Sequence, residues 1–324
     1  ESKTEEAGPM WKAVLKVIGG LAVLIFSCDL FVDNAVVIAK SFGVNDAFIS
    51  LTLIACGTSL PELAASIAAA LKKNTSMALG NVVGSNIFNT FLILGVCSLF
   101  SPILFTKKNI RRDIPMCIFA AVALLVVTLL NQDITRFEGL LLLVGYIAMI
   151  YLTVRADKRE MKENGAPVEE EKPAKQMPVW KIPVWIILGL GGLIWGGNLF
   201  VTSATNVAHA LGVSEAVIAI TLVAGGTSLP ELASSLVSII KGSPSLALGN
   251  VLGSNIANIL LILGTCSTVK PLTMGGVTMF DIYVAVAATG VVMLSALVIG
   301  RDKLTRIEGL LFVGCYIAYV YTLI

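Results

Sequence analysis

The feature that most constrains this chain is an internal repeat. Residues 57–64, Gly-Thr-Ser-Leu-Pro-Glu-Leu-Ala, recur without change at 226–233. Residues 80–89 recur at 249–258 with two changes, and both matches share an offset of 169 residues. A third match, Thr-Arg-x-Glu-Gly-Leu, falls near the end of each half. Self-similarity at a fixed spacing indicates a structural unit that the chain uses twice.

The amino-acid composition is typical of a membrane protein. Of the 324 residues, 56% are apolar and 14% are charged, against about 45–50% and about 25% in a soluble domain. These proportions argue against a soluble enzyme, a nucleic-acid-binding protein and a disordered regulator. A spanning helix needs about 20 apolar residues. The apolar runs give ten candidate spans, at 11–39, 46–70, 76–99, 114–130, 138–154, 180–209, 215–240, 246–268, 279–299 and 307–324.

Each half contains five candidate spans. Because five is odd, the second copy enters the membrane from the opposite side, and the two copies are inverted. Inverted repeats are typical of secondary transporters, which bind their substrates near the bilayer midplane. A duplicated scaffold alone does not explain why the best-matched residues are polar. We predict an all-α polytopic membrane protein of ten transmembrane helices, with inverted five-helix repeats at 1–154 and 180–324 and a linker at 155–179.

Lys and Arg are distributed unevenly between the loops. The loops after spans 1, 3, 5, 7 and 9 hold 16 of them, and the other side holds 7. Cytoplasmic loops are enriched in these residues, so we expect both termini outside and a flexible cytoplasmic linker, in a plasma or inner membrane. The first and sixth spans run to about 30 residues, so they should tilt or project beyond the bilayer.

Each half places a proline and a glutamate inside an apolar run. Glu62 and Glu231 would lie at bilayer depth, where a carboxylate is costly and faces a cavity, an ion or a partner. The alternative is a pair of protonated or hydrogen-bonded core acids. Pro61 and Pro230 precede them and interrupt the helix. Carbonyls freed by such a break can bind a cation, and the candidates about a turn and a half earlier are those of Ala55 and Ala224.

The repeated motifs supply further oxygen donors. The candidate ligands are the hydroxyls of Thr58, Ser59, Ser85, Thr227, Ser228 and Ser254 and the amides of Asn89 and Asn258. Each hydroxyl has the alternative of bonding back to a carbonyl in its own helix. Four further amides lie on other faces and are interpreted as hydrogen-bonding groups between helices, namely Asn81, Asn86, Asn250 and Asn255.

These donors select hard cations such as Ca²⁺ and Na⁺ over Zn²⁺ or Cu⁺, because they are oxygens without His or Cys. Two ionised glutamates carry two negative charges, which one Ca²⁺ neutralises. Two Na⁺ would also neutralise them, and three Na⁺ would leave one positive charge. The two ions should therefore compete for one cluster. Exchange of three Na⁺ for one Ca²⁺ would move one net charge per cycle.

At these residues the chain resembles the sodium/calcium exchanger branch of the calcium/cation antiporter superfamily, in its prokaryotic type without a large regulatory loop. The stretches 57–89 and 226–258 carry the resemblance, which extends over both halves. The resemblance implies that the protein is an antiporter and not an enzyme. Its substrates would be Ca²⁺ and Na⁺, and it would need no cofactor. The resemblance also implies that spans 2, 3, 7 and 8 bind the ions and that spans 1 and 6 slide across them as gating helices.

Carried over by residue, the resemblance makes Glu62 and Glu231 the central ligands of both ions, with the amide of Asn89 beside them. The sodium sites would be formed by two matching sets, Ala55, Thr58, Ser59 and Ser85 in the first repeat and Ala224, Thr227, Ser228 and Ser254 in the second. Some members carry Asp where this chain has Asn258. Its absence lowers the expectation of K⁺ co-transport, because an extra K⁺ would lack a counter-charge, and argues mildly against proton coupling.

Three alternatives remain open at this stage. A H⁺/Ca²⁺ antiporter would use the same carboxylates with a different driving ion. A cation channel is disfavoured by sites enclosed between inverted repeats. An intramembrane hydrolase is disfavoured because no His lies near a motif serine and no Gly-x-Ser-x-Gly occurs. We expect a monomer in the lipid bilayer, with no nucleic-acid partner.

Some polar residues outside the motifs receive other roles. Asp29 and Asp33 of the first span are interpreted as helix-end or interface residues, with ion access as the alternative. His209 is expected at the surface. Glu138 and Glu308 begin the last span of each half, where the helix dipole favours acids in the first turn.

Overall fold

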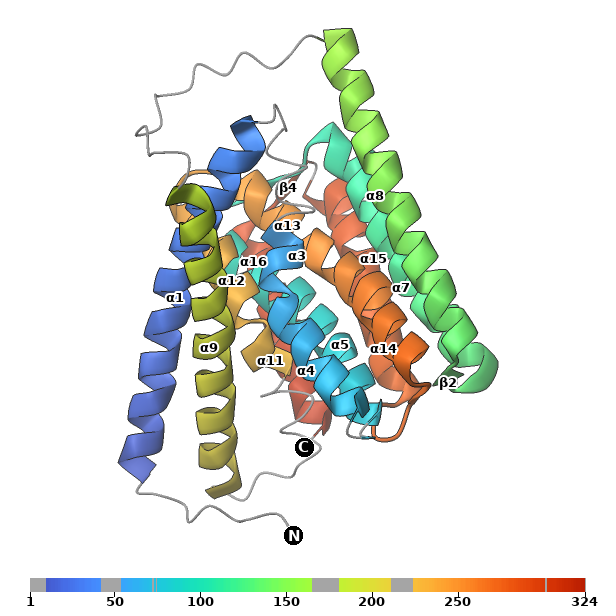
Figure 1. Ribbon diagram of the computed structural model, residues 1–324. Coiled ribbons are helices and arrows are strands. Elements are labelled where there is room, and N and C mark those ends of the chain that lie inside the picture. Colours follow the sequence, from blue (N-terminus) through green and yellow to red (C-terminus); the bar gives the residue numbers. More distant parts are fainter. Residues whose placement is uncertain are drawn as a thin grey trace.

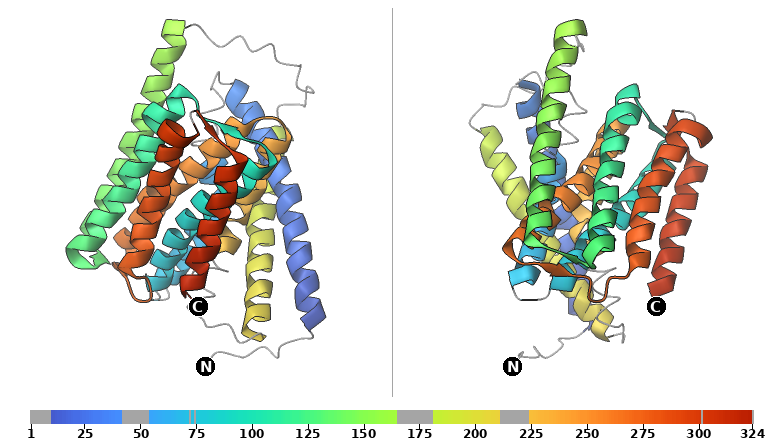
Figure 2. Two further views of the ribbon diagram at one scale, coloured as in Figure 1. Left: turned by 180° about the vertical axis from the view of Figure 1, so that it is seen from behind. Right: turned by 90° about the vertical axis from the view of Figure 1, so that its right-hand side faces the viewer.

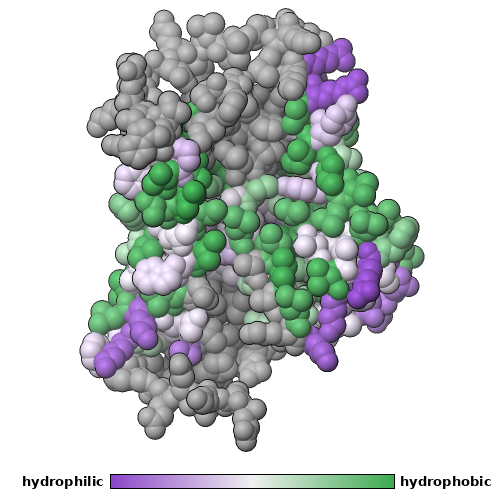
Figure 3. All heavy atoms as spheres, in the orientation of Figure 1, coloured by the Kyte–Doolittle hydropathy of each residue, from purple (hydrophilic) through white to green (hydrophobic). Residues whose placement is uncertain are grey.

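The protein is a helical membrane protein (Figure 1). The computed structural model describes residues 10–41, 54–71, 73, 75–164, 181–210, 224–300 and 302–323. Six of its helices are long and apolar enough to cross a membrane, at Thr75–Phe100, Asn109–Asn131, Arg136–Ala156, Pro244–Val269, Met279–Ile299 and Arg306–Leu323. Apolar side chains form a band across the exposed surface, with hydrophilic groups towards its two ends (Figure 3).

The described elements of the two halves correspond, except that the π-helical segment η3 (Asn109–Asp113) precedes α7 (Ile114–Asn131), whereas η6 (Ser295–Ile299) follows α15 (Met279–Leu294). The first half consists of α1 (Met10–Ser41), α3 (Ala55–Thr58), α4 (Leu60–Leu71), α5 (Thr75–Ile87), the π-helical η2 (Phe88–Ile93), α6 (Leu94–Phe100), β1 (Ile103–Leu104), η3 (Asn109–Asp113), α7 (Ile114–Asn131), β2 (Asp133–Ile134) and α8 (Arg136–Asn164). The second consists of α9 (Lys181–Ala210), α11 (Ala224–Thr227), α12 (Leu229–Ile240), α13 (Pro244–Ile256), η5 (Ala257–Leu263), α14 (Gly264–Val269), β3 (Leu272–Thr273), α15 (Met279–Leu294), η6 (Ser295–Ile299), β4 (Lys303–Leu304) and α16 (Arg306–Leu323).

Two short strand pairs join the halves at opposite ends of the bundle. β1 pairs antiparallel with β4, and β2 pairs antiparallel with β3. β4 lies at the upper end in Figure 1 and β2 at the lower end. Because β1 and β3 follow the equivalent helices α6 and α14, equivalent loops lie at opposite ends. The described helices of the two halves therefore run in opposite directions, as α1 and α9 do side by side.

The helices fall into a buried centre and a lipid-facing periphery. In the spans Thr75–Phe100 and Pro244–Val269, 83% and 94% of the most apolar 18-residue stretch is buried inside the protein. In the spans Arg136–Ala156 and Arg306–Leu323 the buried share of the same kind of stretch is 22% each. Spans 3 and 8, two of the four that the resemblance assigns to ion binding, therefore lie at the centre. The length predicted for the first and sixth spans is confirmed, since α1 has 32 residues and α9 has 30. They form a separate pair beside the bundle (Figure 2).

Glu138 and Glu308 lie in the first turn of each half's last helix, as predicted. Glu138 Oε2 accepts hydrogen bonds from the backbone nitrogen and the hydroxyl of Thr135 at 2.7 and 2.8 Å. Glu308 Oε2 accepts the same pair from Thr305 at 2.8 and 2.7 Å. Each acid therefore also satisfies donors at a helix start, a capping role that was not predicted from the sequence.

The structure differs from the sequence prediction at the end of the first half. The linker was predicted from residue 155, but α8 continues to Asn164. Residues 155–164 are mostly charged helix formers without Gly or Pro, so the helix persists beyond its apolar part. The rest of the predicted linker and the first residues of spans 2 and 7 lie outside the described residues. The side chains of Asp29 and His209 lie outside them too.

Candidate cation-binding site

Both halves break a helix at the same place, as predicted. α3 ends at Thr58 and α4 begins at Leu60, with Ser59 between them. α11 and α12 flank Ser228 in the same way. The two serines have nearly identical dihedral angles, φ −83° and ψ 6° against φ −84° and ψ 4°. The repeated motif therefore builds one local structure twice.

The prediction that the break frees the carbonyls of Ala55 and Ala224 was wrong. Ala55 O accepts the Ser59 amide at 3.0 Å, and Ala224 O accepts the Ser228 amide at 3.1 Å. The proline frees a different carbonyl. Because Pro61 has no N–H group, it cannot donate to the carbonyl four residues earlier, which is that of Gly57. Hydroxyls also reach the two alanine carbonyls, from Thr58 to Ala55 O at 3.4 Å and from Thr227 to Ala224 O at 3.2 Å. A carbonyl oxygen has two lone pairs, so a cation at either carbonyl would replace a hydroxyl donor.

The two carboxylates are held across the interface between the halves. Ser59 Oγ donates to Glu231 Oε1 at 2.7 Å, and Ser228 Oγ donates to Glu62 Oε1 at 3.0 Å. Both glutamates are fully buried, and among the described residues neither forms an ion pair with Lys or Arg. The structure thus brings Glu62, Glu231, Ser59 and Ser228 together, as the sequence predicted.

Four buried oxygens of predicted ligands have no hydrogen-bond partner among the described residues. They are Oε2 of Glu62, Oε2 of Glu231, Oδ1 of Asn89 and Oδ1 of Asn258. A buried polar atom without a partner costs about 1–3 kcal/mol. All four belong to residues that the sequence singled out as ligands, and a bound cation would offset their cost.

The two candidate amide ligands, Asn89 and Asn258, are hydrogen-bonded to a second pair of asparagines. Asn89 Nδ2 donates to Asn255 Oδ1 at 3.1 Å, and Asn258 Nδ2 donates to Asn86 Oδ1 at 3.0 Å. Asn255 Nδ2 in turn donates to Thr90 Oγ1 at 2.8 Å. These bonds use the nitrogen of each amide ligand and leave its oxygen unpartnered. They also confirm that Asn86 and Asn255 link helices.

Asn81 and Asn250 connect the helix breaks to the central helices. Thr227 Oγ1 lies 3.1 Å from Asn81 Oδ1, and Thr58 Oγ1 lies 3.4 Å from Asn250 Oδ1. Two serines that were not predicted from the sequence support these amides. Asn81 Nδ2 donates to Ser66 Oγ at 3.0 Å, and Asn250 Nδ2 donates to the repeat counterpart, Ser235 Oγ, at 3.1 Å. Their signal was the offset of 169 residues that relates them.

The remaining predicted hydroxyls are buried in the cluster but have different partners. Ser254 Oγ donates to Glu231 Oε1 at 3.4 Å, whereas Ser85 Oγ donates to Ala224 O at 3.3 Å. Thr58 Oγ1 also bonds back to Ile54 O at 3.1 Å, the alternative left open for these groups. A back-bonded hydroxyl keeps its acceptor lone pairs for a cation.

The described helices and this cluster define a multi-pass membrane protein with an oxygen-rich polar centre between two halves. The family described as sodium/calcium exchanger protein matches residues 12–155 and 181–324. The chain is 34% identical to the sodium/calcium exchanger MaX1 of Methanosarcina acetivorans, covering 94% of this chain and 96% of that one. It is 37% identical to CaxA of Alkalimonas amylolytica, covering 97% and 99%.

A solved structure extends this likeness to the fold. The sodium–calcium exchanger NCX_Mj, soaked with Na⁺ and Ca²⁺, matches with a TM-score of 0.76 and 34% identity, covering 96% of this chain and 98% of that one. The chain therefore belongs to the sodium/calcium exchanger family. Members of this family are transporters whose substrates are Na⁺ and Ca²⁺.

Proposed function

We propose that the protein exchanges Na⁺ for Ca²⁺ across its membrane by alternating access, with about three Na⁺ per Ca²⁺. The observation that carries the proposal is the set of four unpartnered oxygens on Glu62, Glu231, Asn89 and Asn258. Two carboxylates and two amides suit Ca²⁺, which binds 6–8 hard oxygens. The same two negative charges are exceeded by three Na⁺, so a three-for-one exchange is electrogenic.

The proposed ions share ligands. Ca²⁺ lies between Glu62 and Glu231 and is flanked by Asn89 and Asn258. Na⁺ uses the same carboxylates together with the hydroxyls and carbonyls at the two helix breaks, which are those of Ala55, Thr58, Ser59, Ser85, Ala224, Thr227, Ser228 and Ser254. The cross-half bond from Ser59 to Glu231 supports this sharing, because it joins a sodium ligand to a calcium ligand.

The proposed architecture has ten spans in two inverted repeats, 1–154 and 180–324, joined by a cytoplasmic segment at 155–179 whose first part, to Asn164, continues α8. Both termini face outside in a plasma or inner membrane, and the protein works as a monomer. α1 and α9 slide across the central helices to expose the site to each side in turn. The pairing of α1 with α9 beside the bundle supports their motion as one unit.

The test is Ca²⁺ uptake into proteoliposomes that contain the purified protein. Vesicles loaded with Na⁺ are diluted into Na⁺-free buffer with Ca²⁺, at clamped pH and K⁺. We expect uptake that requires internal Na⁺ and is accelerated by an inside-positive potential, since three positive charges leave for each two that enter. Uptake driven by internal acid without a response to Na⁺ would instead assign the H⁺/Ca²⁺ antiporter.

A channel would give a different result in the same vesicles. Its Ca²⁺ flux would need no counter-ion, and an inside-negative potential would accelerate it. Exchange through the proposed site must saturate with Ca²⁺ and cease when Na⁺ is replaced by choline inside.

A further inference from the structure

The two ends of the bundle share one architecture but differ in charge. Beside the pair of β1 and β4, at the upper end in Figure 1, four basic side chains are exposed, whereas the matched positions beside the pair of β2 and β3, at the lower end, hold one basic residue. The repeat relates the two ends by an offset of 169 or 170 residues. The matched positions are Lys107 and Gly276, Arg111 and Phe280, Lys303 and Asp133, and Arg306 and Arg136.

The fold does not require the basic residues at the upper end. Three of the four positions hold glycine, phenylalanine or aspartate in the other half, within the same strand-and-helix arrangement. We call Lys107, Arg111, Lys303 and Arg306 the basic cluster. All four side chains are exposed.

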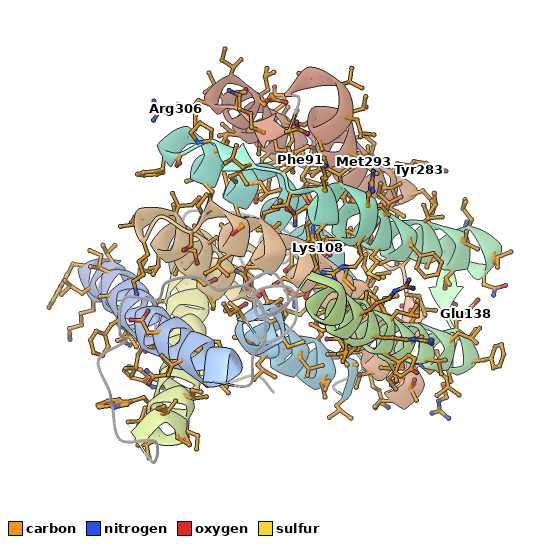
Figure 4. The ribbon with its side chains drawn as sticks, turned by 90° about the horizontal axis from the view of Figure 1, so that it is seen from above. Phe91, Lys108, Glu138, Tyr283, Met293 and Arg306 are labelled. Atoms are coloured by element: carbon orange, nitrogen blue, oxygen red, sulfur yellow. The ribbon has the colours of Figure 1, made fainter. Side chains whose placement is uncertain are left out.

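The basic cluster borders an apolar surface. Leu104 is 59% exposed and pairs with Lys303 across the two strands. Phe100 is 61% exposed, and its carbonyl accepts a hydrogen bond from Arg306 Nη2 at 3.3 Å. Seen from above, Arg306 lies at the outer edge of the bundle (Figure 4). Cationic groups and lipid-facing side chains therefore lie side by side on the perimeter.

Two nearby acids are already engaged with other groups. Asp113 is buried and pairs with Arg112 at 2.6 Å. Glu308 is buried and accepts the hydroxyl of Ser295 at 2.5 Å as well as both donors of Thr305. Asp302 is exposed, but one carboxylate cannot balance four cations. The basic cluster therefore presents net positive charge to its surroundings.

We propose that the basic cluster binds the headgroup of an anionic phospholipid, with the acyl chains along Phe100 and Leu104. Arginine and lysine bind phosphate through charge-assisted hydrogen bonds, and basic residues next to a membrane span attract anionic lipids. A phosphatidylcholine headgroup carries its own cation and gains less from the cluster. The proposal rests on the membrane fold and is independent of which ions are exchanged.

The test is a lipid titration of the purified protein followed by native mass spectrometry, with phosphatidylglycerol and phosphatidylcholine as probes. We expect phosphatidylglycerol to bind more tightly. The double variant Lys107→Gln, Lys303→Gln should weaken that binding roughly thirtyfold, since each basic group near the surface contributes about 1 kcal/mol. The control removes two charges from the other end, by Arg136→Gln and Lys270→Gln, and should retain the affinity of the native protein.

Circular dichroism and the Tm in neutral detergent check that each variant folds. If the double variant fails to fold, the single variants Lys107→Gln and Lys303→Gln are titrated in its place, because both side chains are exposed. Unchanged phosphatidylglycerol affinity in the folded variants would overturn the proposal and leave the cluster as a topology signal only. Equal weakening in the control, or equal affinity for phosphatidylcholine, would also overturn it.

Discussion

Ser59 of the first half donates a hydrogen bond to Glu231 of the second half at 2.7 Å. The reverse bond, from Ser228 to Glu62, measures 3.0 Å. Each glutamate is therefore positioned by the helix break of the opposite half, and neither half contains a complete cluster. A displacement of one break changes the environment of the other half's carboxylate, which couples the two halves through the proposed ion site.

Removing either buried carboxylate should abolish exchange while the protein still folds. Loss of one charge from a buried cluster costs about 2–5 kcal/mol, so Glu62→Gln or Glu231→Gln should weaken Ca²⁺ binding roughly thirtyfold or more. Without ions, the variants should be at least as stable as the native protein, because two buried acids no longer face each other. Thermal unfolding with and without Ca²⁺ measures both effects. Glu138→Gln, which alters only a helix cap, is the control, and near-normal Ca²⁺ flux in either site variant would refute the assignment.

The serines at the helix breaks should affect ion binding more than folding. Ser59→Ala removes a hydrogen bond to a carboxylate, which contributes about 1.5–3 kcal/mol, and one proposed Na⁺ ligand. We expect the Na⁺ concentration for half-maximal exchange to rise roughly tenfold or more. Ser98→Ala is a matched control, because Ser98 is equally buried but donates to Gly95 O at 2.8 Å outside the cluster. The same shift in both variants would show that the effect is not specific to the site.

The charge of the cluster should set which ions accompany Ca²⁺. Asn258→Asp places a third carboxylate beside Glu62 and Glu231, so a single Ca²⁺ no longer neutralises the site. We expect exchange in this variant to require an additional monovalent cation, seen as a dependence of Ca²⁺ uptake on K⁺ or on pH that the native protein lacks. Independence from both ions would contradict the charge argument.

The contact between α1 and α3 leaves no room for a residue larger than glycine at position 57. A Cβ built on Gly57 would lie 2.3 Å from Cζ of Phe31, which is 4% exposed. Gly57→Ala should therefore displace α1 and slow exchange, and adding Phe31→Ala should restore the rate. Rate measurements on the two single variants and the double variant form a cycle that isolates this contact. Gly19→Ala on α1 is the control, because nothing lies within 4 Å of its added Cβ; a double variant slower than both singles would contradict the contact.

Much of the site could be predicted because its information is local and duplicated. The match between 57–64 and 226–233 placed both carboxylates, both helix breaks and the adjacent hydroxyls. The first-turn positions of Glu138 and Glu308 were equally local, since each acid lies two residues after the Thr-Arg pair that begins the motif.

The partners across the halves could not be predicted from the repeat. That Ser59 reaches Glu231 rather than Glu62 depends on how the halves dock, which no spacing within one half encodes. The alanine carbonyls were predicted wrongly because each still accepts a helical hydrogen bond, from the amide of Ser59 or Ser228. Which carbonyl a helix break leaves free is a detail of backbone geometry. The contact of Phe31 with Gly57 also arises only in the packed structure.

The most direct test of a shared ion cluster is equilibrium binding of radioactive Ca²⁺ to the purified protein, titrated with Na⁺ at constant ionic strength with choline. If both ions use Glu62 and Glu231, Na⁺ must displace Ca²⁺ completely, with a Hill coefficient greater than one because several Na⁺ replace each Ca²⁺. Ca²⁺ binding that is unaffected by Na⁺ would contradict the shared cluster.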